Sequence, residues 1–163
     1  MKPRRPKLVA HTMFCDFVTD QADQRFTPFG VYASTLIIDG AEAEIPRLTA
    51  FTILELPPKY RSTIGHIALM EGRNVLAENT FPFSEIQLDE ECDVMLVQMR
   101  LEVGPLILKH GMELQVVFDA GAFKYRSFGL LVTTGTYVPM SELPSSDGSP
   151  KSKPKRVNLG TVH

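Results

Sequence analysis

Residues 94–103 alternate apolar and polar side chains, and this period of two constrains the fold more than any other feature of the sequence. Successive side chains of a β-strand point to opposite faces of the sheet. One face would carry apolar side chains and the other mainly polar ones: Met95, Val97, Met99, Leu101 and Val103 against Leu96, Gln98, Arg100 and Glu102. Leu114, Val116 and Phe118 repeat the alternation. The sequence therefore predicts strands with one buried face and one solvated face.

Other runs rich in Val, Ile, Thr and Phe are separated by Gly, Pro, Asp and Asn, which favour turns. Glu71-Gly72-Arg73-Asn74 predicts a hairpin between residues 67–70 and 75–77. Further strands are predicted at residues 8–18, 29–38, 48–54 and 123–133, and a marginal short helix at residues 84–91. The pattern predicts an all-β fold, an antiparallel β-sandwich of about eight strands. We prefer it to a closed barrel because the strands differ in length.

The chain has 163 residues, 44% of them apolar and 22% charged, as expected for one folded domain of ordinary size. We expect that domain at residues 8–140, between a basic tail at residues 1–7 and a disordered Pro-, Ser- and Lys-rich tail at residues 141–163. No run approaches the roughly 20 apolar residues of a membrane-spanning helix. The basic start lacks the apolar segment of a signal peptide, so we expect a cytoplasmic protein.

Charge is distributed unevenly along the chain. The net charge is −2, but residues 8–150 hold nine of the 17 basic residues and all 19 acidic ones, a formal charge of −10. Lys and Arg residues at the two ends supply the balance. An acidic body repels duplex phosphates, so no specific nucleic-acid binding is expected. Weak attachment of the residue 151–156 tail to nucleic acid or anionic membrane would need only charge.

Ala10-His11-Thr12-Met13-Phe14-Cys15-Asp16, followed by Gly30-Val31-Tyr32, resembles the opening of a family of small bacterial proteins of unknown function. The likeness covers about residues 8–134, and it departs from the family pattern at Phe17-Val18-Thr19, where the family carries a more charged segment. The resemblance implies an all-β fold and a bacterial or phage origin. It implies no activity.

The densest acidic cluster is a possible calcium site, because Ca²⁺ takes six to eight oxygen ligands. Its candidate ligands are Asp89, Glu90, Glu91 and Asp93. Their spacing does not match a known calcium loop, and a solvated turn explains them better. His11 and Cys15 lie about 13 Å apart along an extended strand, too far to share one ion, and we expect a partly buried His and a packed thiol.

Aromatic residues near predicted strand ends are candidates for binding a partner, since aromatic side chains are enriched at interfaces. They are Phe26, Phe29, Phe123 and Tyr125. The competing interpretation is that they close the ends of the core. Nucleophile elbows and phosphate-binding loops are absent from the sequence, and no cofactor is expected.

The sequence thus predicts a non-enzymatic module that contacts a protein partner, or a second copy of itself, through loops or an edge strand. The alternative is a small ligand- or calcium-binding protein or enzyme. Its site would combine Asp16, His11 and Arg100 with the acidic residues 89–93.

Overall fold

The computed structural model of the chain describes residues 9–21, 25–85 and 94–135. The predicted tails, the acidic cluster at residues 89–93 and most of the predicted helix at residues 84–91 lie outside them. Thirteen strands lie within the described residues: β1 (Val9–Cys15), β2 (Phe17–Asp20), β3 (Phe26–Phe29), β4 (Thr35–Ile38), β5 (Glu42–Ile45), β6 (Leu48–Leu56), β7 (Ile64–Glu71), β8 (Asn74–Pro82), β9 (Met95–Val103), β10 (Leu106–Lys109), β11 (Glu113–Ala120), β12 (Phe123–Arg126) and β13 (Leu130–Thr134). Two short 3-10 turns, Pro58–Tyr60 and Phe83–Glu85, complete the described elements.

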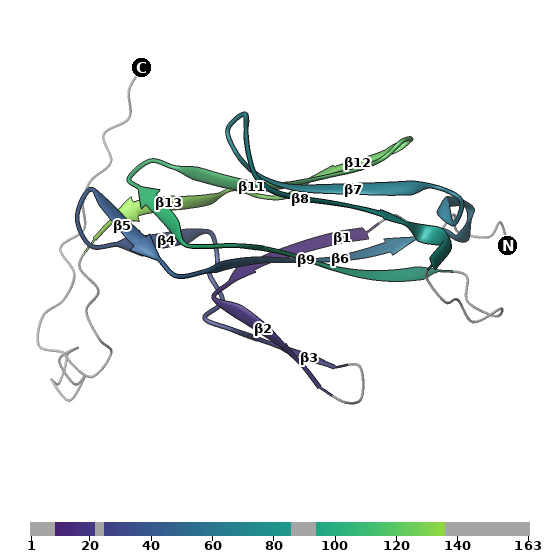
Figure 1. Cartoon of the computed structure of the whole chain (residues 1–163), viewed down its shortest axis with the longest axis horizontal. Helices are drawn as coiled ribbons and strands as arrows, with labels where there is room; N and C mark the ends of the chain where they lie inside the picture. Colours follow the sequence, from purple (N-terminus) through teal and green to yellow (C-terminus); the bar gives the residue numbers. More distant parts are fainter. Residues whose placement is uncertain (1–8, 22–24, 86–93, 136–163) are drawn as a thin grey trace, which may run out of the picture.

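The strands form two packed layers, visible edge-on in Figure 1. One layer is a three-stranded sheet in the order β1-β6-β9, and the other is a sheet in the order β4-β13-β11-β7-β8 with β12 also paired to β11. Buried side chains from both layers, such as Leu54 and Val97 from one and Val116 and Phe118 from the other, join one hydrophobic cluster. The fold is therefore an all-β sandwich, as predicted, and neither sheet closes on itself within the described residues.

The strongest sequence patterns gave correct strands. Every second residue of β9 from Met95 to Leu101 is buried, and the core-facing residues of β11 are at most 1% exposed. The β7–β8 hairpin turns at Gly72, whose positive φ of 56° suits a residue without a Cβ. Period-two alternation thus identified the buried face of each strand correctly.

The strand count differs from the prediction because long runs are interrupted. The predicted strand at residues 8–18 breaks at Asp16 into β1 and β2, and the run at residues 123–133 breaks between Arg126 and Leu130. The short pair β5 and β10 was not predicted. β13 pairs with β4 in parallel, whereas the prediction was a purely antiparallel sandwich. This pairing joins strands far apart in sequence, which local turn signals cannot reveal.

The β2–β3 hairpin packs on the outer face of the three-stranded sheet and projects below it in Figure 1. Cys15, Val18 and Phe51 are buried beneath it in a second, smaller cluster, and Phe26 of β3 lies 4.4 Å from Phe51 between ring centroids. Both faces of β1 and β6 are consequently covered in this region. Among the described residues no helix has the length and apolar character needed to cross a membrane.

Candidate functional site

The four aromatic candidates do not form one surface. Phe26 covers Phe51, and Phe123 lies 5.8 Å from the buried ring of Phe118. The Tyr125 hydroxyl donates to Thr12 Oγ1 at 3.3 Å. These three side chains take part in packing within the chain, as the competing interpretation expects. Phe29 is different, because 44% of it is exposed at the end of β3.

Phe29 belongs to a surface at the root of the hairpin, which we call the hairpin-base surface: Phe17, Phe29, Ile45, Pro46 and Arg47. The rings of Phe17 and Phe29 stack at 4.7 Å with an interplanar angle of 14°. The Arg47 guanidinium lies over the ring of Phe17, 5.1 Å from its centroid. The surface therefore exposes two rings and a cation at one place.

A hollow of about 370 Å³ adjoins Phe17 of the stacked pair and is lined by Asp16, Phe17, Ile45, Pro46 and Arg47. Its position depends on Gly104, at the end of β9, which lies against the backbone of Pro46. A Cβ at Gly104 would stand 2.2 Å from the Pro46 carbonyl oxygen, so the close approach needs glycine. The neighbouring sheet strand thereby fixes the segment that carries Arg47.

Asp16 forms the corner that joins β1 to the hairpin. Its N–H donates to Phe29 O at 2.9 Å, and its carbonyl oxygen accepts from Arg47 Nε at 3.2 Å and from Thr49 Oγ1 at 3.3 Å. Its carboxylate accepts a hydrogen bond from the Tyr32 hydroxyl. Burial, and then the bond to Asp16, raise the pKa of Tyr32, so the hydroxyl remains a protonated donor.

Gly30 allows this corner to form. Its φ is +62°, and a Cβ built on it would lie 1.9 Å from Asp16 Oδ2. The backbone N–H and carbonyl oxygen of Asp16, and its Oδ1, are thus engaged inside the chain. The corner positions the hairpin-base surface, and Asp16 acts there as a structural residue.

The other residues of the predicted ligand or catalytic site do not join Asp16. Arg100 pairs with Asp20 and lies 5.9 Å from the ring centroid of Phe51. His11 is exposed on β1, so the expectation of a partly buried His was wrong, whereas Cys15 is fully buried as expected. His11 stays at the surface because it lies toward the uncovered end of the strand, away from the hairpin. Within residues 9–21, 25–85 and 94–135 no three His, Cys, Asp or Glu side chains gather as metal ligands.

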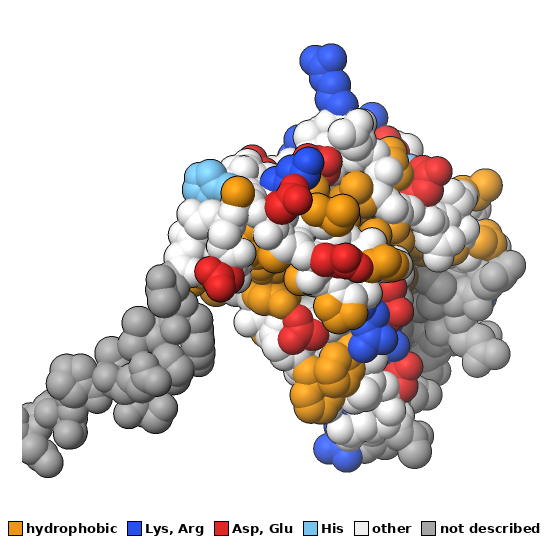
Figure 2. All heavy atoms as spheres, turned by 60° about the vertical axis from the view of Figure 1, so that its left-hand side comes forward, with side chains coloured by type: hydrophobic (Ala, Val, Ile, Leu, Met, Phe, Trp, Pro, Cys, Tyr) orange, Lys and Arg blue, Asp and Glu red, His pale blue; other side chains and the backbone are white. Residues whose placement is uncertain are grey.

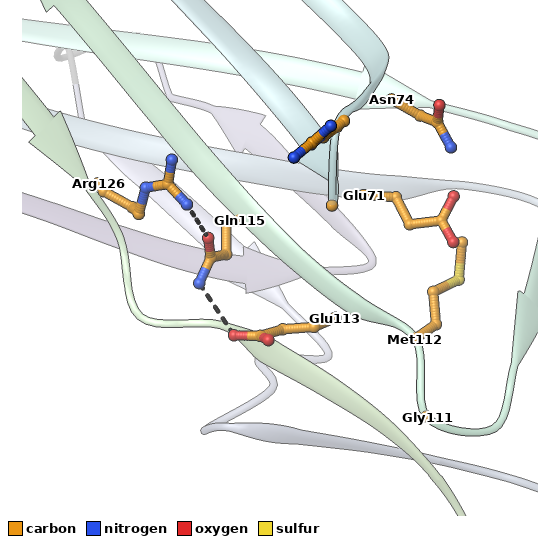
Figure 3. Close-up of a pocket in the computed structure, with 9 residues that line it drawn as sticks. Glu71, Asn74, Gly111, Met112, Glu113, Gln115 and Arg126 are labelled. Carbon is orange, nitrogen blue, oxygen red and sulfur yellow. Dashed lines mark hydrogen bonds between the residues drawn. The ribbon is translucent and has the colours of Figure 1, made fainter.

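A second hollow, of about 590 Å³, lies at the β7–β8 turn and was not foreseen from the sequence (Figure 3). Arg126 Nη1 donates to Gln115 Oε1 at 3.0 Å, and Gln115 Nε2 donates to Glu113 Oε1 at 2.9 Å. Figure 3 shows the Glu71 carboxylate pointing away from Arg126. Glu71 pairs in register with the buried Leu114, so it belongs to the opposite face of the sheet from Gln115. The polar groups of this hollow therefore do not converge on one point.

The chain matches no protein-family model, no curated protein and no solved structure. The resemblance to a family of small bacterial proteins stays a prediction. The structure does give its two motifs a common physical role, because Asp16 of the first contacts Gly30 and Tyr32 of the second. Phe14 O, also in the first motif, accepts from Tyr32 N at 2.8 Å.

Proposed function

We propose that this protein is a non-enzymatic binding or assembly module that contacts another protein through the hairpin-base surface. The observation that carries the proposal is the exposed stack of Arg47, Phe17 and Phe29 beside an apolar-walled hollow. Aromatic and arginine side chains dominate the energetics of protein interfaces, where they fill pockets on the partner or receive its side chains. Stacked rings lose little conformational entropy on binding.

The hairpin base is a better contact surface than the two edges of the larger sheet. β8 is an edge strand, but it carries Glu78, ends at Pro82 and faces a β-bulge between Leu69 and Met70. Charge, proline and bulges all discourage pairing with a foreign strand. β4, at the other edge of the same sheet, has only four residues. Figure 2, in which the β4–β5 end comes forward, shows hydrophobic side chains interspersed with Asp and Glu rather than one broad apolar face.

A comparison of two surface substitutions tests the proposal. Phe29→Ser removes the exposed ring of the hairpin base, whereas Ile64→Ser removes an apolar side chain that is 62% exposed at the start of β7 in the other sheet. Tagged full-length protein is recovered from the source organism, and the co-purifying proteins are quantified. Loss of a stoichiometric partner with Phe29→Ser alone supports the proposal, and equal recovery with both variants contradicts it.

Self-association is a special case of the proposed function. Light scattering on the purified chain distinguishes it, because a discrete oligomer that Phe29→Ser converts to monomer would identify a second copy as the partner. We further propose a bacterial or phage origin and a cytoplasmic location, in line with the buried free thiol of Cys15. The acidic body supports a protein partner rather than nucleic acid.

The alternative of a ligand- or calcium-binding protein keeps one supporting observation, the polar hollow at the β7–β8 turn. Thermal unfolding with Ca²⁺ and with a chelator tests the calcium form of it. A melting temperature that rises with Ca²⁺ in the wild type but not in an Asp89→Asn, Asp93→Asn variant would favour the alternative over a protein-binding module.

A further inference from the structure

Arg47 is held in place but has no acidic partner in the part of the chain that the structure describes. Its Nε donates to Asp16 O at 3.2 Å, and its guanidinium plane lies over Phe17. The described ion pairs involve His66, Arg100 and Lys124 instead. The two terminal nitrogens of Arg47 therefore remain as donors, in a fork whose orientation the ring and the Nε bond already fix.

Two of the carboxylates near the surface are engaged by other groups, whereas Glu44, next to Ile45, is exposed. Asp16 accepts from the Tyr32 hydroxyl, and Asp20 pairs with Arg100. Arg47 is thus the charged group that the hairpin base offers to a partner. A guanidinium on a ring face, beside an apolar wall, is well placed for a carboxylate because reduced solvation strengthens charge-assisted hydrogen bonds.

The hollow beside Arg47 provides a second contact, because it can receive an apolar side chain of the partner. Phe17, Ile45 and Pro46 give it apolar walls, and its volume of about 370 Å³ admits one large side chain. A carboxylate on the Arg47 fork would hold the second residue along the same extended segment over this hollow, because residues two apart point to the same side. Such residues are about 6.6 Å apart along the axis of an extended chain, and Arg47 itself lines the hollow.

The geometry points to one kind of partner: an extended protein segment in which an Asp or Glu side chain stands two residues from a large apolar side chain. The carboxylate pairs with Arg47, and the apolar side chain enters the hollow against Phe17. This inference rests on the proposed function and specifies the partner's chemistry at the same surface. A second copy of the chain, or a free C-terminal carboxylate, are the competing occupants.

Selection from a displayed library of random peptides, with the full-length chain as target, tests the inference. We expect enrichment of Asp or Glu two positions from Phe, Leu, Ile or Met. A selected peptide, synthesised with blocked ends, should lose about tenfold in affinity when its Glu is replaced by Gln, since a charge-assisted pair is lost. This arm leaves the protein unchanged, so it does not depend on how a variant folds.

Protein variants give the reciprocal test. Arg47→Glu should abolish binding and Arg47→Lys should weaken it, because lysine keeps the charge but not the fork. Lys124→Glu, on the exposed β12 of the other sheet, is the matched control for the change of charge and should bind as the wild type does. Circular dichroism verifies that each variant retains the β fold.

Four results would overturn the inference: enrichment without acidic residues, enrichment only of free C-terminal carboxylates, unchanged binding by Arg47→Glu, or self-association that excludes every peptide. None of these results would contradict the loss of a co-purifying partner in the Phe29→Ser variant. The inference can therefore fail while the proposed function stands.

Discussion

The corner at Asp16 makes Gly30 the position where the smallest substitution should do most harm. In Gly30→Ala, the added Cβ destabilises the folded chain in two ways. The backbone has φ +62°, a left-handed conformation that costs a residue with a Cβ about 1–2 kcal/mol. The Cβ would also lie 1.9 Å from Asp16 Oδ2 and 2.5 Å from Asp16 Cγ, so the carboxylate must move.

Moving the carboxylate breaks its hydrogen bond with Tyr32. A hydrogen bond to a charged group contributes about 1.5–3 kcal/mol, so the total loss in the free energy of unfolding should be roughly 2.5–5 kcal/mol. Gly72→Ala is the matched control. Gly72 has φ +56° but no heavy atom within 4 Å of its built Cβ, and it should lose only the conformational part, about 1–2 kcal/mol.

Urea unfolding followed by circular dichroism measures the difference, because the chain has no Trp to report by fluorescence. With a urea dependence of about 2 kcal/mol per molar, the midpoint of Gly30→Ala should fall about 1 M below that of Gly72→Ala. In an Asp16→Ala background, Gly30→Ala should cost no more than Gly72→Ala. Equal midpoints for the two single variants would refute the assignment of a close contact between Gly30 and Asp16.

Three further outcomes follow from the packing and the charges. Phe118→Ala, at 0% exposed, should lose about 3–5 kcal/mol in chemical denaturation, whereas Ile64→Ala should change stability by under about 0.5 kcal/mol. Burial raises the pKa of the Cys15 thiol above 9.0, so above about pH 9 the unfolded chain loses this proton more readily than the folded chain and stability falls. Between pH 8 and 10, the Cys15→Ala variant should therefore lose less stability than the wild type does. A double-mutant cycle on Arg100 and Asp20 should give a coupling below about 1 kcal/mol that shrinks in 1 M salt, because the Asp20 side chain is 73% exposed, and a larger salt-independent coupling would contradict this.

The sequence predicted the fold class because each strand is a local pattern. Alternation in β9 and β11 specifies which side chains are buried, and the glycine turn at Gly72 specifies which strands are neighbours. The parallel pairing of β4 with β13 has no such local signal. The break between β1 and β2 at Asp16 was not predicted either, because a group that holds Asp16, the Tyr32 hydroxyl, is distant in sequence.

The candidate site was predicted only in part, because it depends on residues brought together in space. Phe29 was predicted as a candidate from its position near a strand end. The sequence did not single out Phe17, its stacking partner, or Arg47, which follows Phe29 by 18 residues. Ile45-Pro46-Arg47 reads as an ordinary strand end. Gly104, which holds Pro46 in place, reads as a turn glycine and is 58 residues away. No local sequence pattern predicts the close approach of two backbone segments that are distant in the chain.

Site-specific photo-crosslinking in the source organism tests the central claim most directly. A photoreactive amino acid at position 29, within the hairpin-base surface, is compared with the same amino acid at position 64, which is more exposed but lies in the other sheet. The account predicts a discrete cross-linked protein from position 29 that is absent from position 64 and is lost with Arg47→Glu. Cross-links that are the same from both positions, or none from position 29, would contradict the claim that this surface binds a protein.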